Sequence, residues 1–75
     1  MTRTLFAQIG ELLYGPSWRG ELSTVLKVGY RTITRWESGA HPIPEGIPHD
    51  LAVLCRKKAE RLTKAANQLY NGENR

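Results

Sequence analysis

Side chains that form strong hydrogen bonds recur along one face of the segment RTITRWESG, residues 31–39. In a helix, which turns by about 100° per residue, four of them fall at positions i, i+3, i+4 and i+7: Arg31, Thr34, Arg35 and Ser38. Ile33 and Trp36 fall on the other side. Guanidinium groups bind anions and pair bidentately with hydrogen-bond acceptors. The pattern predicts a short helix that is anchored by Ile33 and Trp36 and presents a basic, hydrogen-bonding face to a partner.

A first helix is predicted near the N-terminus. Apolar residues recur at helical spacing over residues 3–13: Leu5, Phe6, Ile9, Leu12 and Leu13. Gly10 weakens this helix by about 1 kcal/mol relative to Ala. The helix should end at Gly15-Pro16, because Pro16 cannot lie inside a helix.

A second helix of about nine residues is predicted to begin at Trp18, with Ser17 as its N-cap. Its apolar positions follow at i, i+4, i+7 and i+8: Trp18, Leu22, Val25 and Leu26. It breaks near Val28-Gly29. The third helix then begins at about Tyr30, and Gly39 ends it.

A stiff connector and a long helix complete the chain. The connector HPIPEGIPHDL carries three Pro and one Gly, and Pro44 or Pro48 could occupy the first turn of the next helix. That helix is predicted over about residues 47–71, with Asn71-Gly72 at its end. Its apolar positions are Leu51, Leu54, Cys55, Ala59, Leu62, Ala66 and Leu69. Since no strand pattern appears, we expect one all-α domain over residues 1–75, a small bundle of about four helices.

Bulk properties narrow the class of protein. The chain has 75 residues, 11 basic and 7 acidic side chains, and a net charge of +4, which favours an anionic partner. A single Cys excludes an intramolecular disulfide and fits a reducing compartment. No apolar run approaches the roughly 18 residues of a membrane span, and the N-terminus lacks a secretory pattern. We therefore expect a cytoplasmic protein with no membrane partner.

The second and third predicted helices, joined by about three residues, form a helix-turn-helix candidate. Its contacts require apolar residues at set positions and a small residue where the helices cross: Leu22, Leu26, Val28, Ile33 and Trp36, with Ser23 as the small one. Residues 18–39, and above all ITRWESG, resemble the helix-turn-helix of lambda-repressor/Cro-like (Xre-type) DNA-binding regulators. The order W…L…RW…G…PIP…L is similar to small bacterial and prophage-type proteins. The resemblance implies that the third helix enters the major groove of duplex DNA.

The chain departs from that family around the turn. Lys27 stands where the family usually has Gly, so it should adopt near left-handed geometry at a cost of roughly 1 kcal/mol. Gly29 stands where the family often has Ser or Thr, and Gly is tolerated at an N-cap. Arg19 replaces the Gln that usually opens the second helix. It can reach a phosphate but cannot reproduce a Gln network to adenine.

The resemblance and the helical geometry together assign roles on DNA. Base contacts are expected from residues of the third helix: Tyr30, Arg31, Thr34 and Arg35. Phosphate contacts are expected from Arg19, Lys27 and Ser38. For each of these residues, a solvated surface position is the alternative. Glu37 is expected to pair with a neighbouring basic side chain rather than to contact DNA.

The last predicted helix carries a basic run and an apolar seam. The basic run is a solvated face or a contact to flanking phosphates: Arg56, Lys57, Lys58, Arg61 and Lys64. The seam alternates four- and three-residue steps, as in a coiled coil: Cys55, Ala59, Leu62, Ala66 and Leu69. It packs on the first helix or pairs with a second subunit. The expected assembly is a homodimer on an inverted repeat with half-sites about 34 Å apart.

Other functional classes fit the sequence less well. His41, His49 and Cys55 match no structural zinc spacing, and no nucleophile–base pair or phosphate-binding glycine loop is visible. No enzymatic activity, cofactor, metal or small-molecule ligand is therefore expected. A protein-interaction module of antitoxin or adaptor type is an alternative, as is a phage DNA-architecture or recombination accessory protein. The basic third helix favours a sequence-specific DNA-binding regulator that represses by occupying its operator.

Overall fold

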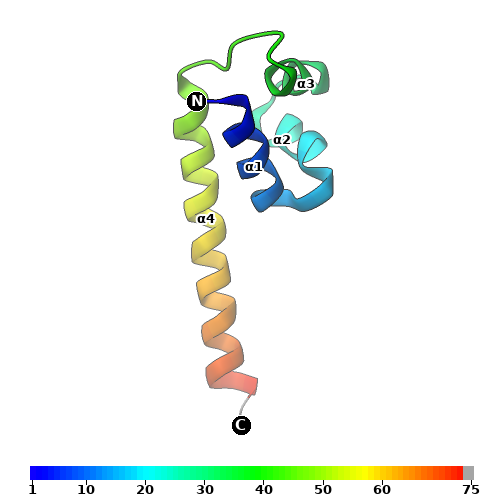
Figure 1. The fold of residues 1–75 in the computed structure, drawn as a ribbon. Coiled ribbons are helices and arrows are strands. Elements are labelled where there is room, and N and C mark those ends of the chain that lie inside the picture. The colour runs from blue at the N-terminus through cyan, green and yellow to red at the C-terminus, as the bar shows by residue number, and fades with distance from the viewer. Residues whose placement is uncertain (74–75) are drawn as a thin grey trace.

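The structure, a computed structural model, describes residues 1–73 and is all-helical over that range, which confirms the predicted all-α class. Figure 1 shows the helices of the N-terminal part gathered into a body, while the long C-terminal helix begins beside this body and runs past it. The elements in chain order are α1 (Arg3–Tyr14), a 3-10 turn (Gly15–Ser17), α2 (Trp18–Leu26), α3 (Tyr30–Ser38), α4 (Gly46–Gln68) and a π-helical turn (Leu69–Glu73). No helix within residues 1–73 combines the length and apolar character needed to cross a membrane.

Phe6 of α1 lies at the centre of the core and is fully buried. Its ring meets Trp18 of α2 edge-to-face, with 5.6 Å between ring centroids, and Trp36 of α3 in the same manner at 5.9 Å. Such pairs are each worth about 0.5–1.5 kcal/mol beyond the area that they bury. The buried core consists of Phe6, Leu13, Trp18, Leu22, Ile33, Trp36, Ile47 and Leu51. A single aromatic contact set therefore holds α1, α2 and α3 together.

Local signals in the sequence place the helix ends. The hydroxyl of Thr2 accepts a hydrogen bond from the backbone N–H of Leu5 at 3.1 Å and caps α1. Gly15 (φ 68°) ends α1 and Gly39 (φ 84°) ends α3, both as predicted. Ser17 is the N-cap residue of α2, although its side chain makes no capping hydrogen bond.

Gly10 allows α2 to approach α1 closely. A Cβ atom built on Gly10 would lie 2.2 Å from Cε3 of Trp18, far inside the normal separation of carbon atoms. Gly10 is itself buried, and the Trp18 ring covers it. The residue that weakens α1 as a helix is therefore the one that lets the largest core side chain pack against it.

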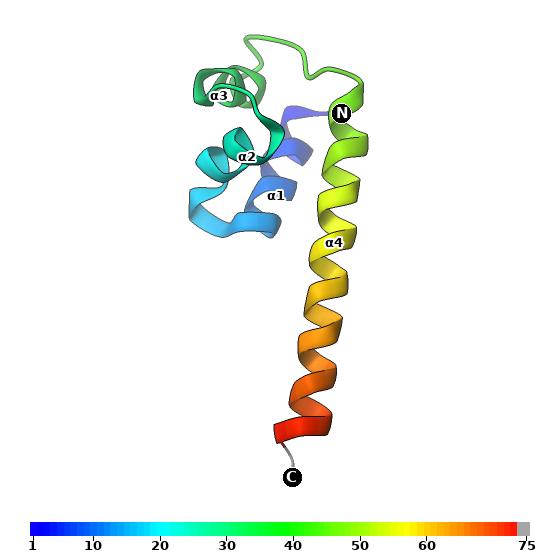
Figure 2. The same cartoon turned by 180° about the vertical axis from the view of Figure 1, so that it is seen from behind.

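Fewer apolar side chains of α1 are buried than its sequence pattern predicts. Phe6 and Leu13 are buried and Ile9 is partly buried, but Leu5 is 44% exposed and Leu12 is 74% exposed. α1 packs against α2 and α3 and, less extensively, against α4, and Figures 1 and 2 show it lying between α4 and α2. Leu12 lies at the end of α1 where α4 leaves the body, and its side chain faces solvent.

α4 belongs to the body only in its N-terminal half. Ile47 and Leu51 are buried there, and Pro48 lies in the first turn as predicted. Nζ of Lys58 donates hydrogen bonds to the backbone oxygens of Leu12, at 3.1 Å, and of Leu13, at the C-terminal end of α1. A cation is favourable at that end of a helix dipole.

The C-terminal half of α4 projects from the body, as Figures 1 and 2 show, and residues 59–72 are all exposed. The molecule consequently measures 53 × 21 × 21 Å. The predicted stop at Asn71-Gly72 is wrong in detail: the α-helix ends at Gln68, and the chain stays helical through a π-helical turn to Glu73. Gly72 does not adopt the positive φ by which Gly15 and Gly39 end their helices.

Candidate nucleic-acid interface

The connection between α2 and α3 is tight. Lys27 adopts left-handed geometry (φ 58°, ψ 42°), which confirms the prediction, and its N–H donates to the backbone oxygen of Ser23. The N–H of Val28 donates to the same oxygen at 3.1 Å. The Ser23 hydroxyl in turn donates to the backbone oxygen of Val28 at 2.6 Å. The small residue predicted at this position therefore also fixes the turn by a hydrogen bond.

Two residues anchor α3 in the core. Ile33 is fully buried and Trp36 is 6% exposed, as predicted. Leu22 of α2 is fully buried in the same cluster, and Leu26 and Val28 pack against it. The position and rotation of α3 are therefore set by buried contacts, and its opposite face is free to meet a partner.

The four predicted base-contacting residues share the free side of α3. Arg31 and Arg35 are exposed, and neither takes part in an ion pair within the described residues. Tyr30, at the start of the helix, is 55% exposed. Thr34 is half-buried between the arginines, and its hydroxyl donates to the backbone oxygen of Arg31 at 2.9 Å. The exposed face is therefore basic, with one aromatic ring at its N-terminal end.

Arg19 is engaged within the molecule. Its Nε and Nη2 donate to the two carboxylate oxygens of Glu37, both at 2.6 Å, and its guanidinium lies 4.7 Å from the centre of the Trp18 ring. The hydrogen bond to Arg19 lowers the pKa of Glu37, and the same hydrogen bond raises the pKa of Arg19. The pair joins the start of α2 to the end of α3, which confirms the predicted structural role of Glu37.

Arg3 holds the C-terminal end of α3. Its Nη1 donates to the backbone oxygen of Ser38 at 2.5 Å, and a Cβ atom on Gly39 would lie 2.8 Å from that nitrogen. The Ser38 hydroxyl donates to the backbone oxygen of Arg35 and accepts from the N–H of Ala40. Ser38 thus closes the helix end, and its predicted phosphate contact has to compete with these bonds. No local pattern in the sequence marks Arg3 for this role.

The connector folds back beside the arginine stripe. The N–H of His41 donates to the backbone oxygen of Arg35 at 3.3 Å. His41 and Pro42 line a shallow hollow together with Thr32, Arg35 and Trp36. The sequence pattern does not indicate this position for His41. Within residues 1–73, no three His, Cys, Asp or Glu side chains gather as a metal site would require.

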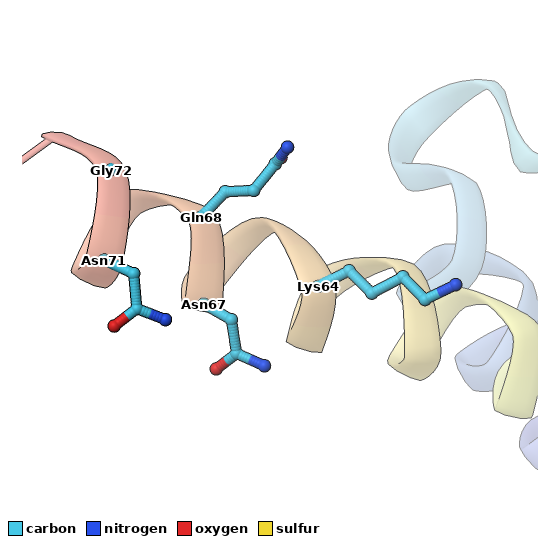
Figure 3. Close-up of a pocket in the computed structure, with 5 residues that line it drawn as sticks. All are labelled: Lys64, Asn67, Gln68, Asn71 and Gly72. Atoms are coloured by element: carbon cyan, nitrogen blue, oxygen red, sulfur yellow. The ribbon is translucent and has the colours of Figure 1, made fainter.

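A second hollow lies on the last turns of α4 and is shown in Figure 3. Its lining residues are Lys64, Asn67, Gln68, Asn71 and Gly72. All of them come from one helical stretch, so the hollow is open helix surface rather than a cavity. Figure 1 places this stretch at the opposite end of the molecule from α3. It is therefore not part of the candidate interface.

The basic run on α4 is also remote from α3. Four of its members are exposed: Arg56, Lys57, Arg61 and Lys64. Lys64 lies 3.8 Å from Glu60 in an exposed i,i+4 pair. Only Lys58 contacts another element, through its hydrogen bonds to α1.

Comparison with known proteins adds no assignment: no protein family, curated protein or solved structure matches the chain significantly. The candidate interface is thus defined by its own geometry. A nine-residue helix is anchored in the core by Ile33 and Trp36, and its C-terminal end is held by Arg3 of α1 and Arg19 of α2. It presents two exposed guanidinium groups to solvent.

Proposed function

We propose that α2, the turn at residues 27–29 and α3 form a helix-turn-helix that binds duplex DNA. The observation that carries the proposal is the pair of exposed arginines, Arg31 and Arg35, directly opposite the buried Ile33 and Trp36. α3 is about 14 Å long, and an α-helix fits the major groove, which is about 12 Å wide. Because its anchors are buried, α3 can enter the groove without rearrangement of the body.

On this proposal, Arg31 and Arg35 read base edges. Each can pair bidentately with O6 and N7 of a guanine. The Thr34 hydroxyl is engaged with the backbone of its own helix, so its methyl group is the part available to a thymine methyl. Tyr30 is exposed beside this stripe, where its ring can reach a thymine or its hydroxyl a phosphate.

Phosphate contacts position the domain on the duplex. Lys27 is exposed at the turn and suits this role without rearrangement. Two nitrogens of Arg19 donate to Glu37, so the main contribution of Arg19 is to hold α3 against α2. Its Nη1 can still donate to a phosphate. Ser38 contributes chiefly by closing the end of α3.

The biological role that follows is that of a small cytoplasmic transcriptional regulator. The resemblance of ITRWESG to lambda-repressor/Cro-like proteins supports it, and binding would repress by occupying an operator. An adaptor or antitoxin that holds a protein partner would need an apolar outer face on α3. The exposed face of α3 carries two arginines instead, which supports DNA as the partner.

Selection of bound sequences from a random duplex library tests the proposal directly, because a defined motif must emerge. On the selected duplex, Arg31→Ala and Arg35→Ala should each weaken binding by about 1–3 kcal/mol, or roughly 5- to 150-fold, and relax preference at one base pair. Lys57→Ala removes the same charge from an exposed site on α4 and is the matched control. Equal losses in all three variants, measured by gel shift at one salt concentration, would reject α3 as the recognition element.

A further inference from the structure

The core-facing side of α4 continues past the body as an exposed apolar strip. At about 100° per residue, Leu62 lies about 20° from the azimuth of the buried Leu51, and Leu69 lies at that same azimuth. Leu62 is 59% exposed and Leu69 is 61% exposed. Leu12, 74% exposed, lies at the C-terminal end of α1, where Lys58 of α4 donates to its backbone oxygen. Ala65 falls between the two leucines on the same side. The strip defined by Leu12, Leu62, Ala65 and Leu69 has no covering element within residues 1–73.

The size of the exposed surface matches what a dimer buries. A compact monomer of 8.5 kDa is expected to expose about 4,700 Å², whereas this chain exposes 5579 Å². The excess of about 900 Å² is close to the roughly 800 Å² that each partner buries in a standard interface. The radius of gyration, 15.0 Å, likewise exceeds the value of about 11 Å for a compact domain of this length.

The charges on α4 favour one relative direction of two such helices. Residues 56–64 carry five basic side chains and one acidic side chain, Glu60, whereas residues 65–72 carry no charged side chain. Parallel helices would place the two basic segments side by side. Antiparallel helices place each basic segment beside the uncharged segment of the other copy.

Steric exclusion also favours the antiparallel arrangement of the two helices. The body lies on the Leu51 side of α4, as Figures 1 and 2 show, so a parallel copy on that side would bring its own body into the same space. The α4 of a second copy can pack against the strip only C-terminal to Lys58 of the first copy. The body of the second copy must then lie near the C-terminal end of the first α4. A projecting helix of about 15 residues is also marginal alone in water, and a partner helix would stabilise it.

We propose that a second copy of this chain binds antiparallel along the free half of α4, with Leu62 packed against Leu69 of the partner subunit. The two-fold axis that relates the paired helices then passes between Ala65 and Ala66. The C-terminal end of each α4 lies next to Leu12 of the other subunit. α3 lies at the level of the N-terminal end of α4, so the two α3 helices are roughly 60 Å apart along the axis and lie at opposite ends. This placement of α3 matters for DNA only if the proposed function holds. In that case the dimer binds two separate duplex segments, rather than two half-sites about 34 Å apart on one face of a single duplex.

Sedimentation equilibrium without DNA tests the dimer. The wild type should sediment at twice 8.5 kDa at tens of micromolar, and Leu62→Glu with Leu69→Glu should sediment at 8.5 kDa. Asn67→Glu with Asn71→Glu is the matched control. It adds the same charge on the opposite side of the same turns, where Figure 3 shows both side chains pointing the same way. A monomeric wild type, or equal behaviour of the two double variants, would overturn the proposal.

Disulfide trapping in a Cys55→Ser background tests the direction. A mixture of Leu62→Cys and Leu69→Cys chains should form a crosslinked dimer under mild oxidation. Neither chain should crosslink alone, because identical positions lie about 10 Å apart along the axis, beyond the reach of a disulfide at about 7 Å. Crosslinking of either variant with itself would indicate parallel helices and overturn the proposal.

The crosslinked dimer then tests the placement of α3. Bound to a biotinylated duplex, it should capture a second, free duplex. Binding of the first duplex without capture of the second would overturn the placement of the recognition helices at opposite ends. Failure to bind either duplex would reject the proposed function, while the crosslinking result, obtained without DNA, would still establish the antiparallel dimer.

Discussion

Gly10→Ala should destabilise the protein, although the substitution favours a helix. In an exposed helix interior, Ala is better than Gly by about 1 kcal/mol. Here the new Cβ would lie 2.2 Å from Cε3 of Trp18, whereas carbon atoms in contact lie about 3.5–4.0 Å apart. The ring or the helix must therefore move by more than about 1 Å. Trp18 is 1% exposed and is backed by Phe6 and the Arg19 guanidinium, so it has little room to move.

Overpacking of this kind costs about 1–3 kcal/mol, and the short distance places this site near the upper value. After the helix propensity is subtracted, a net loss of about 2 kcal/mol is expected, against a total stability of about 4–11 kcal/mol for this length. The melting temperature should fall by about 8–16 °C. Gly20→Ala is the control: a Cβ at Gly20 of α2 meets nothing within 4 Å, so that variant should melt at the same temperature or higher. If thermal denaturation shows that both variants gain stability, Trp18 does not pack on α1 at Gly10.

Three further substitutions test the body. Trp36→Ala should cost roughly 3–5 kcal/mol, a large share of the total stability, and lower the melting temperature followed by circular dichroism; an unchanged melting temperature with lost DNA binding would place the ring on the DNA face instead. Because Arg19 lowers the pKa of Glu37, the ion pair stabilises the fold fully above the ordinary carboxyl pKa and ceases to do so as the pH falls through the lowered value. Urea midpoints between pH 7 and pH 3 should therefore fall more steeply for the wild type than for Glu37→Gln, and parallel curves would contradict this. Lys58→Met keeps the aliphatic stem but removes the charge at the end of α1, which should cost about 0.3–1 kcal/mol in low salt and less in high salt, measured by the same titration.

The helices and the rotation of α3 were predictable because their signals are local. Ile33 and Trp36 are spaced to share one helix face, and Gly39 follows them directly. These two inferences depend on residues within a few positions of one another, which is the range over which backbone geometry acts. The left-handed geometry of Lys27 follows instead from the resemblance, because Lys27 stands where that family usually has Gly.

The contacts that position α3 join distant parts of the chain and could not be predicted in the same way. Arg19 is separated from Glu37 by 18 positions and Arg3 from Ser38 by 35. The sequence does not distinguish Lys58 from the other members of the basic run, yet Lys58 is the one that hydrogen-bonds to the end of α1. The sequence marks Gly10 only as a local weakness of the helix, because only the folded structure brings Trp18 over it. Which basic residue is structural and which is free depends on packing that no local pattern records.

The position of the two tryptophans has a consequence for spectroscopy. Trp18 and Trp36 both contact Phe6, and the free half of α4 contains no tryptophan. Indole emission therefore reports the melting of the body alone, whereas far-ultraviolet ellipticity also reports the projecting turns, whose hydrogen bonds are local and open at low free energy. In dilute solution the ellipticity should begin to fall at a lower temperature than the emission changes. If a second copy covers those turns, the two curves should converge as the protein concentration rises, so two optical signals from one unlabelled sample would follow the assembly of the chain.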